Sequence, residues 1–563
     1  MWRDRRVFPR SCMRSAHRGS TGAYNRNRYT RPRRRPQLAL RAVTQPGTVR
    51  GPSRTIRAAL CRDCPLARRR RGPLMNTHAR WLCWSSLALL QAACNPTEDE
   101  TSNVAAAAPA AASEQRAQIA AVQADRSQFV STSAIGSGAR DPGPRGALVG
   151  AGGPLPGLSV LELALFQVGR EDFIEEESAS DGLGPTMNLD SCGGCHSQPA
   201  MGGTSPAVNP QVAFAGKLSA TNVVPPFITL KGPVREARFV KGSDGQRDGG
   251  VHALFTLAGR TDARDCRVRQ PDFAGAMAAG NVIFRIPTPL FGAGLIELIP
   301  DGEILANLGR NTSTKRSLGI RGRGNIMPAA QAISAQPNKN GNDGTLGRFG
   351  WKAQNKSLLV FSGEAYNVEM GITNDLFPTE RDETEACQYT HSPNSVTHLE
   401  AATPLEAISS IEKFTAFMRL LAPPTPSTDQ PGGSASIANG KTLFANVGCA
   451  LCHVPSLRTG NASVAALRYK NVNLYSDLLL HDMGAGLADG ILQGEAGARE
   501  FRTAPLWGLG QRLFFLHDGR TSDLKQAVLA HRSDGSEANG VVSKFGALAD
   551  REQQDLLNFL RSL

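Results

Sequence analysis

The chain has 563 residues, which is long enough for two or more separately packed cores. Its formal net charge is +14, but residues 1–74 hold 21 Arg, no Lys and two acidic residues, a net charge of +19, so the remaining residues together carry −5. The positive charge is confined to the amino-terminal end, and this distribution excludes a basic nucleic-acid-binding surface on the rest of the protein.

The first 94 residues are expected to precede the folded protein. Residues 1–74 are rich in Arg, Pro and Gly without a sustained apolar period, so we interpret them as a non-native or disordered leader, a basic arm being the alternative. Residues 75–94 have the layout of a secretory signal peptide, with an apolar run too short to span a bilayer. The run ends at Leu90–Cys94, a variant of the bacterial lipoprotein box. The sequence therefore predicts export to the periplasm, with Cys94 as a candidate lipid anchor.

Two linkers divide the remaining chain. Residues 95–157 are dominated by Ala, Gly and Pro, and this composition is typical of a tether rather than of a packed core. A second Pro- and Gly-rich stretch, 423–433, separates two longer segments. We therefore predict an N-terminal domain over 158–422 and a C-terminal domain over 434–563.

Each predicted domain contains one Cys-x-x-Cys-His motif. The motif residues are Cys192, Cys195 and His196 in the first domain and Cys449, Cys452 and His453 in the second. On a helix, positions i, i+3 and i+4 share one face, so two thiols can form thioethers with a porphyrin while the imidazole lies beneath its iron. Zinc would need four ligands, which the two motifs could supply only jointly, and a thioredoxin-like redox pair would not need the adjacent His. The motifs therefore predict two covalently attached c-type hemes, each with an axial His.

Two cysteines remain outside these motifs and the amino-terminal leader and signal segments. They are Cys266 and Cys387. An even pair left over in an exported protein indicates a disulfide bond, and a reactive dithiol is the alternative.

Two amphipathic helices are predicted from their caps and apolar periods. The first begins after Thr403, which forms a capping box with Glu406, and continues to 421. The second follows Asp550, paired with Gln553 in the same way, and runs to the end of the chain.

These helices belong to an internal repeat. After each Cys-x-x-Cys-His motif the chain shows Phe-Arg, then Pro-Leu-aromatic-Gly-x-Gly, then a helix with Phe-x-Arg-x-Leu. The matching segments are Phe284–Arg285, Pro289–Gly294 and Phe417–Leu421 in the first copy, and Phe501–Arg502, Pro505–Gly510 and Phe559–Leu563 in the second. The repeat predicts a mainly α fold with two cytochrome c-like domains, the first carrying a long, loop-rich insertion with some short strands.

From about 158 to 563 the sequence resembles the bacterial di-heme c-type oxidoreductases known as peroxidases or thiol oxidoreductases, which are relatives of the di-heme cytochrome c peroxidases. The resemblance is carried by nine segments: Gly182–Pro185, Ser191–His196, Arg285–Glu297, Arg348–Lys352, Met370–Thr373, Leu474–Asp477, His481–Gly484, Phe501–Pro505 and His517–Arg520. It implies that electrons enter through the C-terminal heme and that peroxide reacts at the N-terminal one.

The resemblance also suggests a sixth ligand for the C-terminal heme. In the relatives this ligand is usually a Met on a helix shortly after the His-Asp-Gly segment. The matching stretch here ends in His531, which predicts bis-His ligation and a lower reduction potential than with Met. A surface His on an amphipathic helix is the alternative.

The N-terminal heme pocket is harder to interpret. A peroxidase needs a group that moves a proton between the peroxide oxygens, and Glu297, at the end of the first repeated motif, is our candidate for this catalytic residue. The chain lacks the aromatic-Asp-Gly-Arg segment that follows the corresponding region in the peroxidases. His252 and His481 are further candidates to face the iron.

Only Trp351 and Trp507 follow the signal segment, and either could relay electrons between the hemes, with buried packing as the alternative. The leading hypothesis is a redox enzyme that takes electrons from a small redox protein or a quinol-linked chain and reduces a small oxidant. A non-catalytic electron-transfer cytochrome is the alternative, and a ligand-binding heme protein is a third.

Overall fold

The computed structural model describes residues 138–146, 150–242, 244–247, 253–326, 346–379 and 384–563. All of them belong to one compact unit, Ser85–Leu563. The predicted leader, the signal peptide, Cys94, His252 and most of the tether lie outside the described residues. Within the described ranges no helix combines the length and the apolar character that a membrane span requires.

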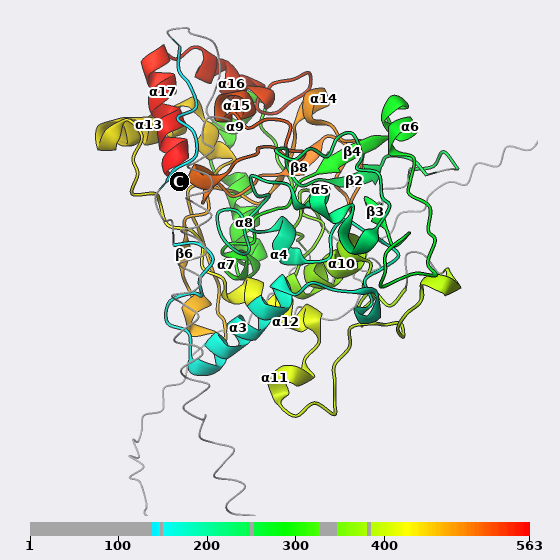
Figure 1. The fold of residues 1–563 in the computed structure, drawn as a ribbon. Coiled ribbons are helices and arrows are strands. Elements are labelled where there is room, and N and C mark those ends of the chain that lie inside the picture. Colours follow the sequence, from blue (N-terminus) through cyan, green and yellow to red (C-terminus); the bar gives the residue numbers. More distant parts are fainter. Residues whose placement is uncertain (1–137, 147–149, 243, 248–252, 327–345, 380–383) are drawn as a thin grey trace, which may run out of the picture. The chain divides into compact units, whose positions relative to one another are not determined.

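The described residues are mainly helical, as expected, with a few short strands (Figure 1). The first ten helices are α3 (Val160–Ile174), α4 (Cys192–Cys195), α5 (Pro210–Phe214), α6 (Phe273–Ala278), α7 (Ala293–Glu297), α8 (Asp301–Gly309), α9 (Thr312–Leu318), α10 (Leu358–Met370), α11 (Pro404–Ala407) and α12 (Ser410–Leu420). The next five are α13 (Gly433–Val447), α14 (Gly484–Leu487), α15 (Leu524–Ala530), α16 (Asn539–Gly546) and α17 (Asp550–Ser562). Short 3₁₀ turns are η2 (Ala179–Asp181), η3 (Lys217–Ser219), η5 (Glu385–Cys387), η6 (Cys449–Leu451), η7 (Ala465–Leu467) and η8 (Leu509–Gln511).

The strands form four separate antiparallel pairs. They are β1 (Thr186–Met187) with β3 (Phe255–Thr256), β2 (Glu236–Phe239) with β4 (Val282–Arg285), β5 (Leu457–Arg458) with β6 (Asn471–Val472), and β7 (Leu480–Asp482) with β8 (Glu500–Arg502). Each pair is too short to stand alone and depends on the surrounding helices and loops.

The first pair of long helices, α3 and α12, crosses at a glycine. Ser159 caps α3 in a capping box with Glu162. A Cβ at Gly169 would lie 2.2 Å from the carbonyl oxygen of Lys413, so only glycine allows the two backbones to come this close. The Phe417 ring then packs 4.9 Å, centroid to centroid, from Phe173.

A second pair, α13 and α17, repeats this arrangement. A Cβ at Gly440 would lie 2.0 Å from the carbonyl oxygen of Asp555, and the Phe559 ring packs 5.5 Å from that of Phe444. In both pairs the contacted carbonyl lies four residues before the packed Phe. The internal repeat in the sequence therefore corresponds to a repeated helix crossing.

The helix predicted after Thr403 begins as expected, with the Thr403–Glu406 capping box, but the predicted run to 421 is divided into two helices. The helix after Thr403 stops at Ala407, because Ser409 and Glu412 form a second capping box that starts α12. The last helix is preceded by Ala549, whose backbone N–H donates to the Glu552 carboxylate at 2.9 Å. A second cap thus divides the first predicted helix, and at the start of the last helix the bonded carboxylate belongs to Glu552, where Gln553 was predicted.

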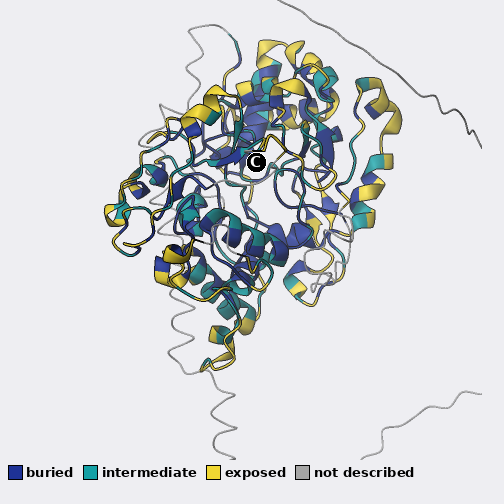
Figure 2. Ribbon diagram, turned by 90° about the vertical axis from the view of Figure 1, so that its right-hand side faces the viewer, coloured by how far each residue is buried: buried dark blue, intermediate teal, exposed yellow. Residues whose placement is uncertain are grey.

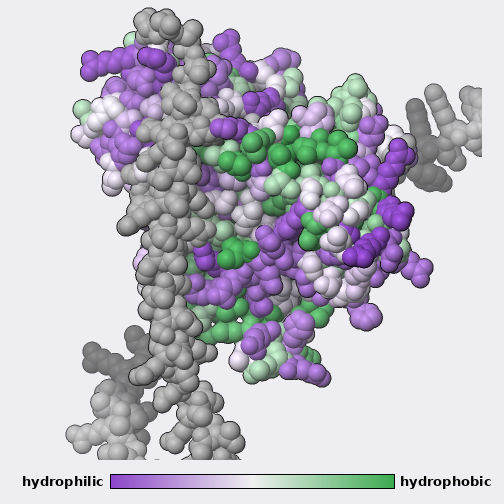
Figure 3. Space-filling model, viewed as in Figure 1, coloured by the Kyte–Doolittle hydropathy of each residue, from purple (hydrophilic) through white to green (hydrophobic). Residues whose placement is uncertain are grey.

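The buried apolar side chains form two main clusters. Figure 2 marks the buried residues along the ribbon of the described part of the chain. The smaller cluster contains residues of α13, α15, α16 and α17, together with Leu509 of η8, Phe515, Leu563 and Ala139 of the described amino-terminal segment. The larger one contains the α3, α10 and α12 faces and also the apolar residues of 457–479. This segment of the predicted C-terminal domain therefore packs in the core of the N-terminal helices. Hydrophilic side chains cover most of the described surface visible in Figure 3, and hydrophobic ones gather in separate patches.

A buried ion pair fixes the last helix of each repeat. Arg419 of α12 donates from Nε to the Glu297 carboxylate at 2.7 Å, and Arg561 of α17 donates to Asp141 at 2.7 and 2.6 Å. Asp141 also accepts the Leu524 N–H at the start of α15. The described segment 138–146 is thereby tied to both α15 and α17.

The long stretch between the first motif and α12 is cross-linked. Cys266 and Cys387 form a disulfide bond, which joins the loop before α6 to η5. The two cysteines are separated by 121 residues, so the bond closes a large loop of the chain.

Candidate functional site

The histidines of both motifs are held by the same kind of hydrogen bond. The Nδ1 atom of His196 lies 2.9 Å from the carbonyl oxygen of Gly203, and that of His453 lies 3.0 Å from the carbonyl oxygen of Tyr475. A carbonyl can only accept, so each Nδ1 carries the proton and each Nε2 has a free lone pair. Burial lowers the pKa of both rings to about 4. Both are therefore neutral imidazoles, the form that binds a metal.

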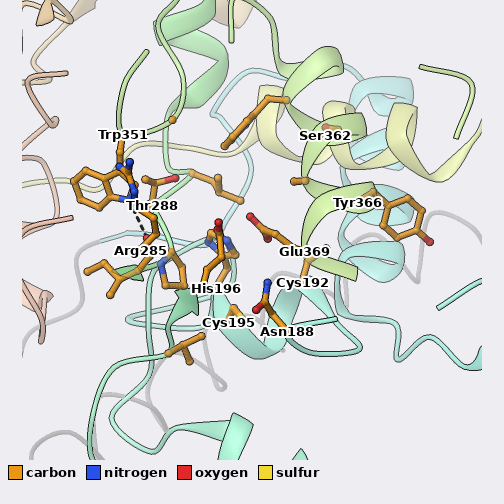
Figure 4. Close-up of a pocket in the computed structure, with 18 of the residues that line it drawn as sticks. Asn188, Cys192, Cys195, His196, Arg285, Thr288, Trp351, Ser362, Tyr366 and Glu369 are labelled. Carbon is orange, nitrogen blue, oxygen red and sulfur yellow. Dashed lines mark hydrogen bonds between the residues drawn. The ribbon is translucent and has the colours of Figure 1, made fainter. Parts of the chain in front are cut away.

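A first cavity surrounds the motif at α4 (Figure 4). Cys192, Cys195 and His196 line it, and neither cysteine is disulfide-bonded. Asn188 also lines it, and both polar atoms of its side chain are buried without a hydrogen-bond partner among the described residues. A buried amide of this kind indicates a site for a polar ligand group.

Carboxylates line the same cavity on α10 and β2. Glu369 points toward the labelled Cys192 and His196 in Figure 4. Burial raises the pKa of Glu369 to about 8, and the charge of Glu236 adds to the rise, whereas Arg238 opposes it. Glu369 is thus protonated at neutral pH and has the character of a proton donor.

Tyr366 connects this cavity to a second acid. Its ring lines the cavity, and its hydroxyl, which points away from it in Figure 4, donates to Glu177 at 2.5 Å. Burial raises the pKa of Glu177 to about 7, although the bond from Tyr366 lowers it. Two protonatable carboxyls therefore lie on this side of the cavity.

Glu297, the predicted acid–base residue, is not among the residues that line the cavity. It is fully buried, pairs with Arg419 and accepts the Leu358 N–H at 2.9 Å. With its oxygens held by these partners, Glu297 secures α7 to α10 and α12. The contacts give this residue a packing role, and its catalytic role stays a prediction.

A second cavity surrounds the motif at η6 and is lined mostly by apolar residues. His453 and His531 both line it, the latter at the end of α15. The Nδ1 atom of His531 lies 2.8 Å from the carbonyl oxygen of Ala527, so its Nε2 also has a free lone pair. Burial lowers the pKa of His531. His453 and His531 are thus two buried, neutral imidazoles with matching tautomers. His517 also lines the cavity, and burial lowers its pKa to about 3, so this ring is neutral as well.

His481 lines this cavity as well but is held differently. Its Nε2 lies 3.0 Å from an Asp477 oxygen and its Nδ1 lies 2.8 Å from a Glu537 oxygen. Both ring nitrogens must donate to these carboxylates, so His481 is an imidazolium without a free lone pair. Cys452, Asp477 and His481 form a cluster with metal-ligand atoms within 4.8 Å of one another. The ion-paired ring accounts for this cluster without a metal.

Trp351 lines both cavities, whereas Trp507 lines neither. The Trp351 indole N–H donates to the Ile286 carbonyl at 3.0 Å, which fixes the ring in place. Trp507 is buried in the larger core cluster, and a Cβ at Gly292 would collide with its ring. Of the two predicted relay residues, only Trp351 is placed between the motifs.

A comparison with protein-family models matched residues 251–563, more than half of the chain, to the family described as "Di-haem oxidoreductase, putative peroxidase". The chain belongs to this family. The match begins after Cys192–His196, so the first motif lies outside the matched segment. Membership establishes the chain as a di-heme oxidoreductase, in agreement with the family predicted from the sequence motifs, and implies heme cofactors.

Comparison with curated proteins returned no match. Among solved structures, a similar chain is the Kuenenia stuttgartiensis hydrazine synthase pressurised with xenon, at 20% identity and a TM-score of 0.20. The match covers 29% of this chain and 56% of that chain, so this di-heme oxidoreductase spans about half the length of the matched structure. A likeness of this size carries no structural argument.

Several site residues of this di-heme oxidoreductase were missed in the sequence. Glu369 directly precedes the Met370–Thr373 segment that carried part of the family resemblance, and this proximity was the available signal. Asn188 lies three residues before Ser191, the N-cap of α4, without a pattern of its own. Arg512 is distant in sequence from both motifs, and only the folded chain brings it to the second cavity.

Proposed function

We propose that the protein is an exported c-type cytochrome with two covalent hemes, in which electrons enter at the C-terminal heme and a small oxidant such as peroxide is reduced at the N-terminal one. The observation that carries this proposal is the contrast between the cavities. One contains several histidines, among them the neutral His453 and His531. The other contains His196 as its single His together with Glu369, whose pKa is raised, and Trp351 borders both.

The residues present fit two c-type hemes. Each cavity is lined by a complete Cys-x-x-Cys-His motif whose His has its Nδ1 held by a carbonyl. Cys192 and Cys195 would bind the first porphyrin with His196 as axial ligand, and Cys449 and Cys452 the second with His453. Bound heme supplies one-electron redox chemistry at its iron.

His531 is proposed as the second axial ligand in the C-terminal cavity. Its Nδ1 bond to Ala527 and the adjacent helix α15 fix the ring. His531 and His453 line the same cavity. With a heme in this cavity, His453 and His531 would supply two nitrogen ligands, which favour a low reduction potential. This cavity suits electron transfer and leaves no place for substrate.

Trp351 is proposed as the contact between the two sites. An aromatic ring fixed by a hydrogen bond and bordering both cavities shortens the path that an electron must take through the protein. The role of relay therefore belongs to Trp351, and Trp507 serves packing.

Glu369 is proposed as the proton donor in the N-terminal cavity. Reduction of hydrogen peroxide to two water molecules consumes two electrons and two protons. The electrons come from a small redox protein or a quinol-linked chain, and a carboxyl with a pKa of about 8 can deliver a proton to the oxygen that leaves as water. Asn188 can hold the oxidant by a hydrogen bond from its unpartnered amide.

The localisation and domain plan belong to the same proposal. The disulfide between Cys266 and Cys387 suits the oxidising periplasm, and covalent hemes suit export through the segment 75–94. We propose two cytochrome c-like domains, 158–422 and 434–563, the first with a long insertion, and a lipid anchor at Cys94.

The test is to express the chain with its export segment in a bacterium that matures c-type cytochromes. Heme staining on a denaturing gel, and the mass of the intact protein, should show two porphyrin additions. Cyanide or carbon monoxide should then bind at one heme and leave the other low-spin. A colourless protein, or one without added porphyrin mass, would overturn the proposal.

One observation favours a second candidate, an electron-transfer cytochrome without catalysis. Met418 of α12 lines the N-terminal cavity and carries a thioether that can bind heme iron. If Met418 closed the second axial position, both hemes would be inert to cyanide and carbon monoxide. Ligand binding at one heme in the Met418→Leu variant, absent from the wild type, would establish this candidate.

A further inference from the structure

The second cavity contains two arginines whose charge nothing in it neutralises. Arg502 and Arg512 both line it, and both are at least nine-tenths buried. Within the described part of the chain neither forms an ion pair with a carboxylate. Arg502 donates only to backbone carbonyls, those of Gly350 and Thr503.

Arg512 has unused donors. Its Nε and Nη2 atoms are buried without a hydrogen-bond partner among the described residues. Its guanidinium lies 5.9 Å from the centre of the Trp351 ring. Leaving guanidinium N–H groups buried and unpaired is costly, so a folded protein is expected to satisfy them with a ligand.

The two arginines also repel each other. Burial lowers the pKa of both to about 10, and in Arg502 the charge of Arg512 adds to this effect. Glu537 is the one carboxylate among the described residues that line this cavity, and it is already bonded to His481 and to the Arg321 backbone N–H. The missing negative charge must therefore come from the bound group.

We infer that Arg502 and Arg512 bind the propionate carboxylates of the C-terminal heme and thereby turn its propionate edge toward Trp351. This inference rests on the proposed function, because it requires a heme in the cavity. Two carboxylates offer four acceptor oxygens to two guanidinium groups. Hydrogen bonds between such charged groups are short and directional. Electrons leaving this heme would then pass along the Arg512–Trp351 contact.

Two arginines beside the propionates should affect the reduction potential of this heme. Cations next to the propionates keep these ionised and disfavour the additional positive charge of the oxidised iron, so they raise the reduction potential. Removal of either charge should lower it. A propionate without its arginine should also take up a proton more easily, which makes the potential depend on pH.

The experiment compares Arg502→Gln and Arg512→Gln with the wild-type holoprotein. The control, Arg499→Gln, removes an equal charge from an exposed arginine that pairs with Asp482 and does not line the cavity. The C-terminal heme is recognised by its low-spin signal, and its potential is measured by spectroelectrochemical titration. We expect each cavity variant to lower the equilibrium constant for one-electron reduction at least tenfold, or about 59 mV, with both hemes still attached.

Unchanged potentials in both cavity variants, with the heme count intact, would overturn the inference and leave the proposed function standing. A wild-type protein without two hemes would overturn both. If the variants do not retain heme, the wild type still provides a test. Its C-terminal potential should stay constant between pH 6 and 8, and a slope in this range would contradict arginine-bound propionates.

Discussion

The two repeats of this di-heme oxidoreductase share the same helix crossing and differ in the side chains that line their cavities. In each, two helices cross at a glycine, Gly169 or Gly440, against a carbonyl four residues before a packed Phe. In each, a second glycine faces the carbonyl of the arginine that forms the buried ion pair: Gly294 faces Arg419 and Gly510 faces Arg561. The glycines and the ion-paired arginines thus recur at equivalent places in both repeats, because each helix crossing requires close backbone packing. We call this shared crossing the scaffold.

The cavities that this scaffold supports have different chemistry. The C-terminal one adds a second neutral imidazole, His531, on α15. The N-terminal one has Glu369 and the unpartnered Asn188 instead. Under the proposed function, this difference in a few side chains opposite the motif would assign electron transfer to one copy of the scaffold and substrate reaction to the other.

The largest expected effect is on turnover and concerns Glu369, which lines the N-terminal cavity. Glu369→Gln should lower turnover with peroxide about 10²- to 10⁴-fold, because the variant cannot donate the proton. Steady-state rates with a reduced electron donor measure this. In the wild type the rate should fall as the pH rises above about 8, where Glu369 loses its proton, and the variant should lack this decline.

The matched control for Glu369 is Glu364→Gln. Glu364 lies on the same helix but hydrogen-bonds to Asn355 and does not line the cavity. It should retain most of the rate. Equal losses in both variants would show that α10 acts through packing rather than through proton donation.

The next effect is on stability and tests the shared ion pair. Asp141→Asn should lower the free energy of unfolding by about 3–5 kcal/mol, because Arg561 would remain fully buried without its partner. Glu297→Gln should cost less, since the Arg419 side chain is 25% exposed and can be solvated. Urea unfolding of the holoprotein measures both. If both variants lost the same free energy of unfolding, the two ion pairs would contribute equally in spite of their different exposure.

The pair at Asp141 also has a predictable pH dependence. Burial raises the pKa of Asp141, but the charge and hydrogen bonds of Arg561 lower it further, and the net pKa lies below the ordinary value of 3.8. The ion pair therefore contributes its full stability above that value. The contribution is lost as the pH falls through the lowered pKa. Asp141→Asn should show a weaker loss of stability in acid than the wild type.

A smaller effect is expected at the helix crossings. Gly169→Ala and Gly440→Ala should each lower the free energy of unfolding by about 1–3 kcal/mol, because the methyl group would overlap a backbone carbonyl. Gly302→Ala and Gly546→Ala, where a Cβ meets no atom within 4 Å, should be neutral or slightly stabilising. If only one of the two crossing variants lost stability, the two helix crossings would not be energetically equivalent.

The smallest predicted effect lies at the C-terminal heme. His531→Met should raise its reduction potential, with at least a tenfold change in the equilibrium constant for one-electron reduction, or about 59 mV, because a thioether replaces a nitrogen ligand. Spectroelectrochemical titration measures this shift. An unchanged low-spin spectrum and potential would show that His531 does not bind the iron.

Local sequence patterns were sufficient to recognise those features whose chemistry depends on the spacing of residues along the chain. The two Cys-x-x-Cys-His motifs, the spare cysteine pair and the repeated Phe, Gly and Arg positions could be recognised without a structure. Glu297 shows the limit of this approach. It occupies a plausible place in a motif, but the pairing with Arg419 that determines its role joins residues 122 positions apart.

The sequence by itself thus predicted the mainly helical class and the residues proposed to bind porphyrin, because these follow from period and spacing. The family was predicted from the resemblance of its motif segments, and the family match bears it out. Only the tertiary structure decided that Glu369 faces the first cavity, that Trp351 borders both and that Arg502 and Arg512 meet in the second. Such encounters join distant parts of the chain. They depend on how helices and loops pack against one another, which no local pattern encodes.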